Sequence, residues 1–216
     1  MKRLIFYDLD GTLVDTLQDI ADAANHMLVR LGLPPREPTD IRGAIGSGVQ
    51  ELVRRCLRTD DPARIDQGVA LYRAYYTQHL LDHSRLYPGA QKLLDHFKDR
   101  RQAVITNKPN PYSTDILRSL GVAGYFCEII GGNSGYPAKP DPAALLAVMG
   151  REGVAAEQAV LIGDSPIDIE TGRRAGALTV TLTHGFSTAA EIRGASPDVL
   201  VDSFDELLIL VTAQRW

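Results

Sequence analysis

Two aspartates stand two positions apart, directly after a short apolar run near the start of the chain. Asp8 and Asp10 follow residues 4–7, and Gly11 comes next. The apolar run is typical of a buried strand, in which residues two apart point to the same side. Unpaired carboxylates held together raise each other's pKa, so this pair calls for a cation. Oxygen ligands of this kind favour a hard divalent ion such as Mg²⁺.

Further polar groups follow apolar segments later in the chain. They are Thr106 with Asn107 beside it, Lys139, and the acidic pair Asp164 and Asp168. The carboxyl ends of parallel strands meet at one edge of a sheet, so we expect these groups to converge there. Alone, a threonine after a strand usually forms a turn or a helix cap, and a lysine before proline usually lies at the surface. Their shared placement favours one common site.

In this order, the motifs resemble those of the haloacid dehalogenase superfamily, and most closely its phosphoglycolate phosphatase-like branch. The resemblance covers essentially the whole chain. The matching residues, in chain order, are Asp8-x-Asp10-Gly11-Thr12, Thr106, Lys139, and Gly163-Asp164 with Asp168. The tetrapeptide Thr106-Asn107-Lys108-Pro109 is similar to that branch as well.

The resemblance implies magnesium-dependent hydrolysis of a small phosphate monoester through an aspartyl-phosphate intermediate. Asp8 is expected to attack phosphorus, and Asp10 to protonate the leaving oxygen and then activate water. Thr106 and Lys139 are expected to bind the phosphoryl oxygens. The implied metal ligands are Asp8, the backbone carbonyl of Asp10, and Asp164, with Asp168 as an outer partner of the metal or of Lys139.

Two regions of the chain have different periodicities. Residues 15–86 show helical spacing and no predicted strand; Thr39 or Asp40 is expected to cap a short helix, and Asp61 a long one. From Tyr87 onward apolar strands alternate with helices, which predicts a parallel sheet. The predicted strands are residues 4–7, 103–106, 127–130, 159–162, 178–182 and 199–201. We therefore expect an α/β fold. Its core is a Rossmann-like, doubly wound parallel sheet made by residues 1–14 and 87–216, with residues 15–86 inserted as an α-helical cap.

A glycine-rich segment of the expected cap contains Arg42, Gly46, Ser47 and Gly48. This segment resembles the cap loop of the phosphoglycolate phosphatase-like branch. An arginine beside exposed backbone amides suits a second anionic group such as a carboxylate, which favours 2-phosphoglycolate as the substrate. Asn107 is predicted to be a further substrate contact. The alternative is that the glycines only separate two helices and that the arginine is solvated.

Other activities stay open, namely a pyrophosphatase, a sugar-phosphate or nucleotide phosphatase, a β-phosphoglucomutase-like phosphomutase, and a non-catalytic binding protein. The presence of Asp10 argues against dehalogenation, which needs no metal. Phosphonatases use a cap lysine, and residues 15–87 contain none. Mutases of this type carry a histidine where this chain has Ile20, although His26 follows on the same predicted helix.

The composition of the chain limits the classes of partner that it could bind. The chain has 216 residues and a net charge of -4, without a basic run that would indicate nucleic acid. It has no apolar segment long enough for a signal peptide or a membrane span. Its two cysteines, Cys56 and Cys127, fit a reducing cytoplasm. We expect a cytoplasmic monomer or homodimer that acts on a small phosphorylated metabolite. His79 and His83 have helical spacing, but exposed histidines are commoner than zinc ligands.

Overall fold

The computed structural model describes residues 1–214 and 216. Within them, six strands form one parallel sheet in the order β5-β4-β1-β6-β7-β8. The strands are β1 (Leu4–Tyr7), β4 (Arg101–Ile105), β5 (Glu128–Ile130), β6 (Ala159–Gly163), β7 (Leu178–Leu182) and β8 (Val199–Val201). The predicted α/β class and doubly wound parallel core are confirmed.

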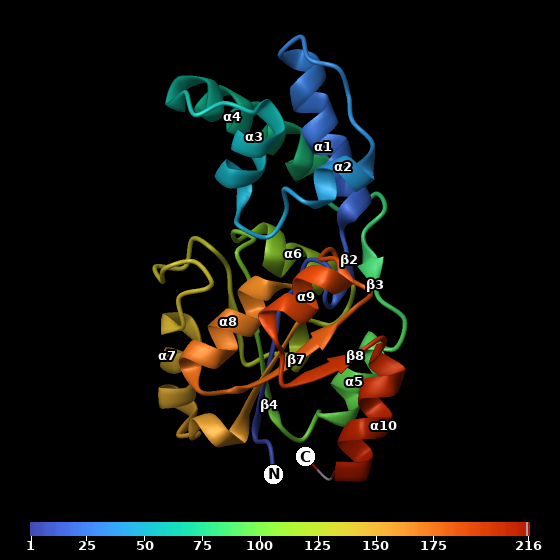
Figure 1. The fold of residues 1–216 in the computed structure, drawn as a ribbon, viewed down its shortest axis with the longest axis vertical. Coiled ribbons are helices and arrows are strands. Elements are labelled where there is room, and N and C mark those ends of the chain that lie inside the picture. Colours follow the sequence, from blue (N-terminus) through green and yellow to red (C-terminus); the bar gives the residue numbers. More distant parts are fainter. Residues whose placement is uncertain (215) are drawn as a thin grey trace.

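Helices cover both faces of this sheet (Figure 1). Along β1, Ile5 and Tyr7 point to one face, whereas Leu4 and Phe6 point to the other, and all four are fully buried. The first face packs against α5 (Ala90–His96), α6 (Tyr112–Ser119) and α10 (Phe204–Gln214). The second face packs against α7 (Ala143–Glu152) and α8 (Pro166–Ala175), and α9 (Ala189–Ala195) contacts α8. Burial on both faces explains why the strands are continuous apolar runs.

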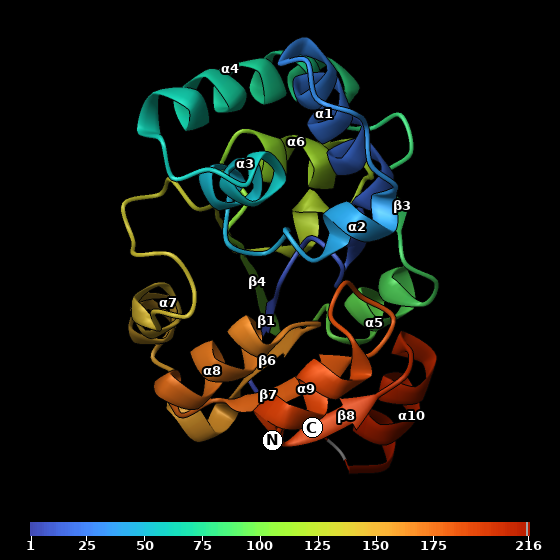
Figure 2. The ribbon, with the colours of Figure 1, turned by 45° about the horizontal axis from the view of Figure 1, so that its top comes forward.

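A helical block lies at one end of the molecule, with α4 crossing its top (Figures 1 and 2). Its helices are α1 (Leu17–Arg30), α2 (Pro38–Arg42), α3 (Val49–Leu57) and α4 (Pro62–His79). They enclose an apolar cluster of their own, to which Met27, Val53 and Tyr76 contribute buried side chains. This separate cluster shows that the block does not depend on the sheet for its core.

The helix ends of this block were predicted with mixed success. Asp61 caps α4 as predicted, because its side chain accepts a hydrogen bond from the backbone N–H of Ala63 at 3.1 Å. The predicted cap of α2 at Thr39 or Asp40 was wrong, since the helix begins at Pro38 after an extended Glu37. Proline fixes φ near the helical value and needs no N–H at the first helical position, so it starts the helix earlier.

The chain crosses between the sheet and the helical block through a small antiparallel ribbon. Its strands are β2 (Val14–Asp15) and β3 (Arg85–Leu86), where the sequence predicted no strand. Two residues are too few for an alternating pattern to appear, so periodicity could not reveal this pairing. The ribbon holds the outgoing and returning segments side by side.

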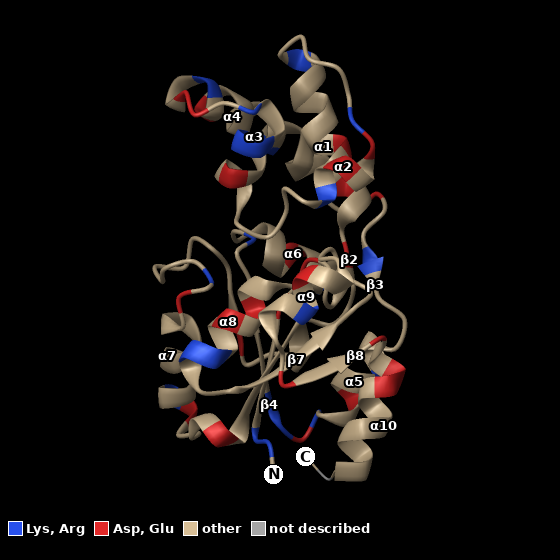
Figure 3. Cartoon of the chain, in the orientation of Figure 1, with Lys and Arg blue, Asp and Glu red and all other residues tan. Residues whose placement is uncertain are grey.

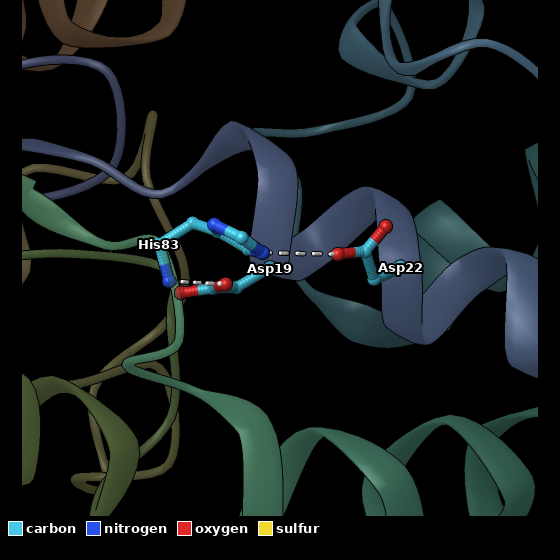
Figure 4. A group of neighbouring side chains, drawn as sticks. All are labelled: Asp19, Asp22 and His83. Carbon is cyan, nitrogen blue, oxygen red and sulfur yellow. Dashed lines mark hydrogen bonds and ion pairs between the residues drawn. The ribbon is translucent and has the colours of Figure 1, made fainter.

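Asp19 joins the same two segments one helical turn further on (Figure 4). Its carboxylate accepts hydrogen bonds from the backbone N–H of His83 at 2.9 Å, and from the backbone N–H and hydroxyl of Ser84 at 2.8 and 2.6 Å. Asp22 lies 3.9 Å from the ring of His83. Because both oxygens of Asp19 already have donors, we interpret this group as a structural joint rather than a metal site. His79 pairs separately, with Asp82 at 2.8 Å.

Charge is mixed over the whole molecule. Figure 3 shows Lys and Arg interspersed with Asp and Glu on the helical block and around the sheet, in keeping with the net charge of -4. No helix in the described part of the chain is long and apolar enough to cross a membrane.

Candidate active site

The ends of three neighbouring strands deliver polar side chains to one cavity. Because β1 lies between β4 and β6, Asp8, Thr106 and Asp164 emerge together at the carboxyl edge of the sheet. The backbone N–H of Asp8 donates to the carbonyl of Ile162 at 2.9 Å, which extends the parallel pairing past the end of β1. All three polar residues line the cavity. The structure thus brings together residues that are far apart in the sequence.

Lys139 reaches these residues from the loop between β5 and α7. Its ammonium lies 2.8 Å from Oδ1 of Asp8 and 2.6 Å from Oδ1 of Asp168, and its side chain is 3 % exposed. Burial alone would lower the pKa of a lysine, but the two carboxylates outweigh burial and raise the pKa of Lys139 above its usual value. This lysine is therefore positively charged at neutral pH and can neutralise a phosphoryl group.

Asp168 holds Lys139 and the start of α8. Its Oδ2 accepts hydrogen bonds from the backbone N–H and the hydroxyl of Ser165, at 3.2 and 2.6 Å, in a capping box. Its Oδ1 accepts from Lys139. A side chain at Gly163 would place a Cβ 2.3 Å from the carboxyl carbon of Asp168, so this approach requires glycine. Of the two predicted roles for Asp168, these bonds favour that of a partner of Lys139.

Asp164 is held by the loops around it. Its oxygens accept a hydrogen bond from the Thr12 hydroxyl at 2.8 Å and from the backbone N–H of Phe186 at 2.7 Å. Glycines allow this packing, because a Cβ at Gly11 or Gly185 would come within 2.4 or 2.2 Å of Asp164. Burial, followed by the nearby Asp168 and Asp8, raises the pKa of Asp164 well above its usual value.

The three acids suit a divalent cation. Asp8, Asp164 and Asp168 each offer an oxygen, and these oxygens lie within 4.8 Å of one another. Oδ1 of Asp8 is buried and faces the ammonium of Lys139 at 2.8 Å. Burial, partly offset by Lys139, raises the pKa of Asp8 to about 6. A hard cation bound by Asp8 and Asp164 would give Oδ1 of Asp8 a further partner and would relieve the repulsion among the three carboxylates.

Asp10 is held by a second lysine, which the sequence analysis missed as a site residue. Nζ of Lys108 lies 2.9 Å from Oδ1 and 3.1 Å from Oδ2 of Asp10, and the Thr16 hydroxyl donates to Oδ1 at 2.7 Å. The backbone N–H of Lys108 donates to the Thr106 hydroxyl at 3.2 Å, so the turn after β4 carries this lysine to the site. Its position two residues after Thr106 was the available signal.

Asn107 links the helical block to the sheet. Its Nδ2 donates to the carbonyls of Gly46 at 2.9 Å and of Lys139 at 3.1 Å, and its Oδ1 accepts from the backbone N–H of Lys139 at 2.8 Å. These bonds use both ends of the amide to position protein groups. The predicted contact of Asn107 with substrate stays a prediction.

The cavity has a volume of about 240 Å³ and lies between the sheet edge and the helical block. This volume is below the roughly 300–1,000 Å³ of sites for drug-sized ligands, so the cavity suits a small molecule. Arg42, Gly46, Ser47 and Gly48 all line it, as does Tyr76 of α4. Gly46 and Gly48 have φ of 112° and 87°, a region that favours glycine.

Comparisons with known proteins agree with this fold. Residues 5–182 match the family described as Haloacid dehalogenase-like hydrolase. The phosphoglycolate phosphatase of Pseudomonas putida is 37% identical over 96% of this chain and 79% of its own length. The phosphoglycolate phosphatase of Nitrosococcus oceani is 33% identical over 97% of this chain and 96% of its own length.

Two solved structures are also similar. A crystal structure described as a predicted phosphoglycolate phosphatase from Haemophilus somnus has a TM-score of 0.92 and 31% identity, covering 97% of this chain and 98% of that one. A haloacid dehalogenase-like family hydrolase from Streptococcus pneumoniae has a TM-score of 0.87 and 26% identity, with coverage of 97% and 98%.

The chain therefore belongs to the haloacid dehalogenase-like hydrolase family. Within that family it is a phosphoric monoester hydrolase, the class of activity named for both curated relatives. The recognition of this superfamily from the ordered motifs is confirmed.

Proposed function

We propose that this protein is a cytoplasmic, magnesium-dependent phosphatase whose preferred substrate is 2-phosphoglycolate. The observation that carries the proposal is the buried cluster at the sheet edge, in which Asp8 meets Lys139 and Asp164 beside a small cavity. The names of the curated relatives support the choice of substrate. A second anionic group on the substrate fits the position of Arg42 on the cavity wall.

In the proposed reaction, Asp8 attacks the phosphorus in line with the leaving oxygen and becomes an aspartyl-phosphate. Thr106 and Lys139 hydrogen-bond the phosphoryl oxygens as charge shifts onto them. Asp10 gives a proton to the leaving oxygen and then takes one from the water that hydrolyses the acyl phosphate. Mg²⁺, held by Asp8, Asp164 and the backbone carbonyl of Asp10, would neutralise phosphate charge.

We also propose that residues 15–86 act as a cap over a catalytic core formed by residues 1–14 and 87–216. The helical block has its own apolar cluster, and the chain enters and leaves it through the paired β2 and β3. In this arrangement Arg42, Gly46, Ser47 and Gly48 hold the end of the substrate that is distant from the phosphoryl group. The protein would work as a monomer or a homodimer.

A phosphomutase is the main alternative, and two residues weigh against it. Ile20, at the place of the mutase histidine, lines the cavity. His26 stacks on Tyr75 at 4.6 Å and lines a separate surface hollow with Asp22 and Asn25. No imidazole from α1 therefore faces the cavity, whose described lining contains no histidine. Pyrophosphate, sugar phosphates and nucleotides remain alternative substrates for the same chemistry.

The test is phosphate release with Mg²⁺ from 2-phosphoglycolate, pyrophosphate, sugar phosphates and nucleoside monophosphates. We expect 2-phosphoglycolate to have the highest kcat/KM, and Asp8→Asn to lower kcat by about 10⁴-fold or more because the nucleophile is lost. Equal, weak turnover of every ester would reject 2-phosphoglycolate as the preferred substrate. Full activity in Asp8→Asn would reject the mechanism.

A further inference from the structure

We infer that Lys108 is a positioning residue that orients the carboxylate of Asp10 toward the reacting oxygen. The inference rests on the proposed function, in which Asp10 transfers the protons. Two buried lysines divide the acids of the site between them. Among the described residues, Lys139 pairs with Asp8 and Asp168, whereas Lys108 pairs with Asp10 alone. Lys108 therefore acts on the proton-transfer group, Asp10, and not on the nucleophile, Asp8.

The contacts of Lys108 fix the direction of the Asp10 carboxylate. The ammonium reaches both oxygens, at 2.9 and 3.1 Å, and the Thr16 hydroxyl holds Oδ1 at 2.7 Å. The side chain of Lys108 is 5 % exposed and that of Asp10 is 13 % exposed, so solvent screens the pair little. Two donors acting on one carboxylate leave it little freedom to rotate away from the cavity that it lines.

Lys108 is itself held from two sides. From the sheet, its backbone N–H binds the hydroxyl of Thr106, at the end of β4. From the helical block, the ring of Tyr76 lies over the ammonium, with 4.8 Å between Nζ and the ring centre. An ammonium over an aromatic face is attracted by the ring. The position of Lys108, and through it that of Asp10, therefore depends on both parts of the molecule.

The effect of Lys108 should be largest in the second half of the reaction. An ammonium that contacts both oxygens of Asp10 holds the carboxylate where it can take a proton from the attacking water. In that half, the carboxylate takes a proton from water, the water oxygen bonds to phosphorus, and the bond between phosphorus and Asp8 breaks. Phosphate leaves, and Asp8 is again a free carboxylate.

The experiment uses p-nitrophenyl phosphate, whose leaving group departs as a stable anion and needs little protonation. We expect Lys108→Met to lower steady-state kcat by about 10- to 100-fold. Formation of the aspartyl-phosphate should be spared, so rapid mixing should show a burst of p-nitrophenolate approaching about one equivalent per enzyme. Lys108→Arg should recover part of kcat, because it restores a cation opposite Asp10.

The controls separate positioning from a structural role and from failure of the proposed function. Lys98→Met removes an exposed lysine and should leave kcat and the burst unchanged. A Lys108→Met variant that loses the burst and the steady state equally, or that has normal kcat, would overturn the inference alone. Full activity in the Asp8→Asn variant would overturn the proposed mechanism and this inference together.

Discussion

The sheet edge and the loop of the helical block contribute to the same cavity in different ways. At the sheet edge, Asp8 and Asp164 follow paired strands, and Lys139 is buried between two carboxylates. In the loop, Arg42 makes no ion pair with any described residue, and Gly46 adopts a backbone conformation that favours glycine. On the proposed function, phosphoryl chemistry would depend on the mutually paired groups of the sheet edge, and choice among esters would depend on a loop that can vary without disturbing them.

Lys139→Met tests the paired groups of the sheet edge and has the largest expected effect on stability. Removing the ammonium leaves Asp8 and Asp168 facing each other in a buried site. Loss of one partner from a buried ion pair typically costs about 3–5 kcal/mol. We expect that decrease in the free energy of unfolding, measured by urea denaturation at pH 7 without metal.

Lys98→Met is the matched control, because it removes an exposed lysine. It should change the free energy of unfolding by less than about 0.5 kcal/mol. Equal stability of the two variants would show that the paired groups of the sheet edge are not a mutually dependent unit.

The free energy of unfolding of the metal-free protein should also depend on pH through the sheet edge, and this effect is smaller. The pKa of Asp8 is raised to about 6 in the folded chain, chiefly by burial. Between about pH 4 and pH 6 the folded state therefore binds more protons than the unfolded state, so stability falls as pH rises through this range. Asp8→Asn removes this contribution, and we expect the variant to be more stable than wild type at pH 7 by about 1–3 kcal/mol.

Urea denaturation at pH 4 and pH 7 checks this sign. The advantage of Asp8→Asn should shrink at pH 4, where the carboxyl is protonated in the folded state and about half protonated in the unfolded state. Mg²⁺ should stabilise wild type more than the variant. An advantage of equal size at both pH values would mean that ionisation of Asp8 is not its origin.

The sheet was the part of the fold most open to prediction. β1, β7 and β8 have the predicted bounds. β5 and β6 differ from prediction by one residue at one end, and β4 begins two residues earlier and ends one residue earlier than predicted. Strands buried on both faces are continuous apolar runs, and the polar residue that ends each run marks the site. Asp8, Thr106 and Asp164 could therefore be placed together before any coordinates were known.

The contacts of Lys108 and Tyr76 could not be predicted in the same way. Lys108 lies two residues after Thr106, which indicates that it is near the site, but nothing in the sequence indicates that its ammonium reaches Asp10. Tyr76 has the spacing of a core residue on α4, and it is one, yet its ring also covers Lys108. Such contacts join parts of the chain whose relative placement depends on tertiary packing. Local periodicity carries no information about that packing.

Arg42→Ala tests the loop of the helical block and has the smallest expected effect. Arg42 lines the cavity on the helical block and contacts none of the paired acids at the sheet edge. If it binds the carboxylate of 2-phosphoglycolate, its removal should lower kcat/KM for that ester about tenfold, the worth of one charge-assisted hydrogen bond. Ethyl phosphate lacks the carboxylate and should be hydrolysed at an unchanged rate. Arg64→Ala, on the exposed start of α4, is the control and should alter neither substrate. An equal decrease for both esters would place Arg42 with the phosphoryl machinery and end the distinction between the two regions.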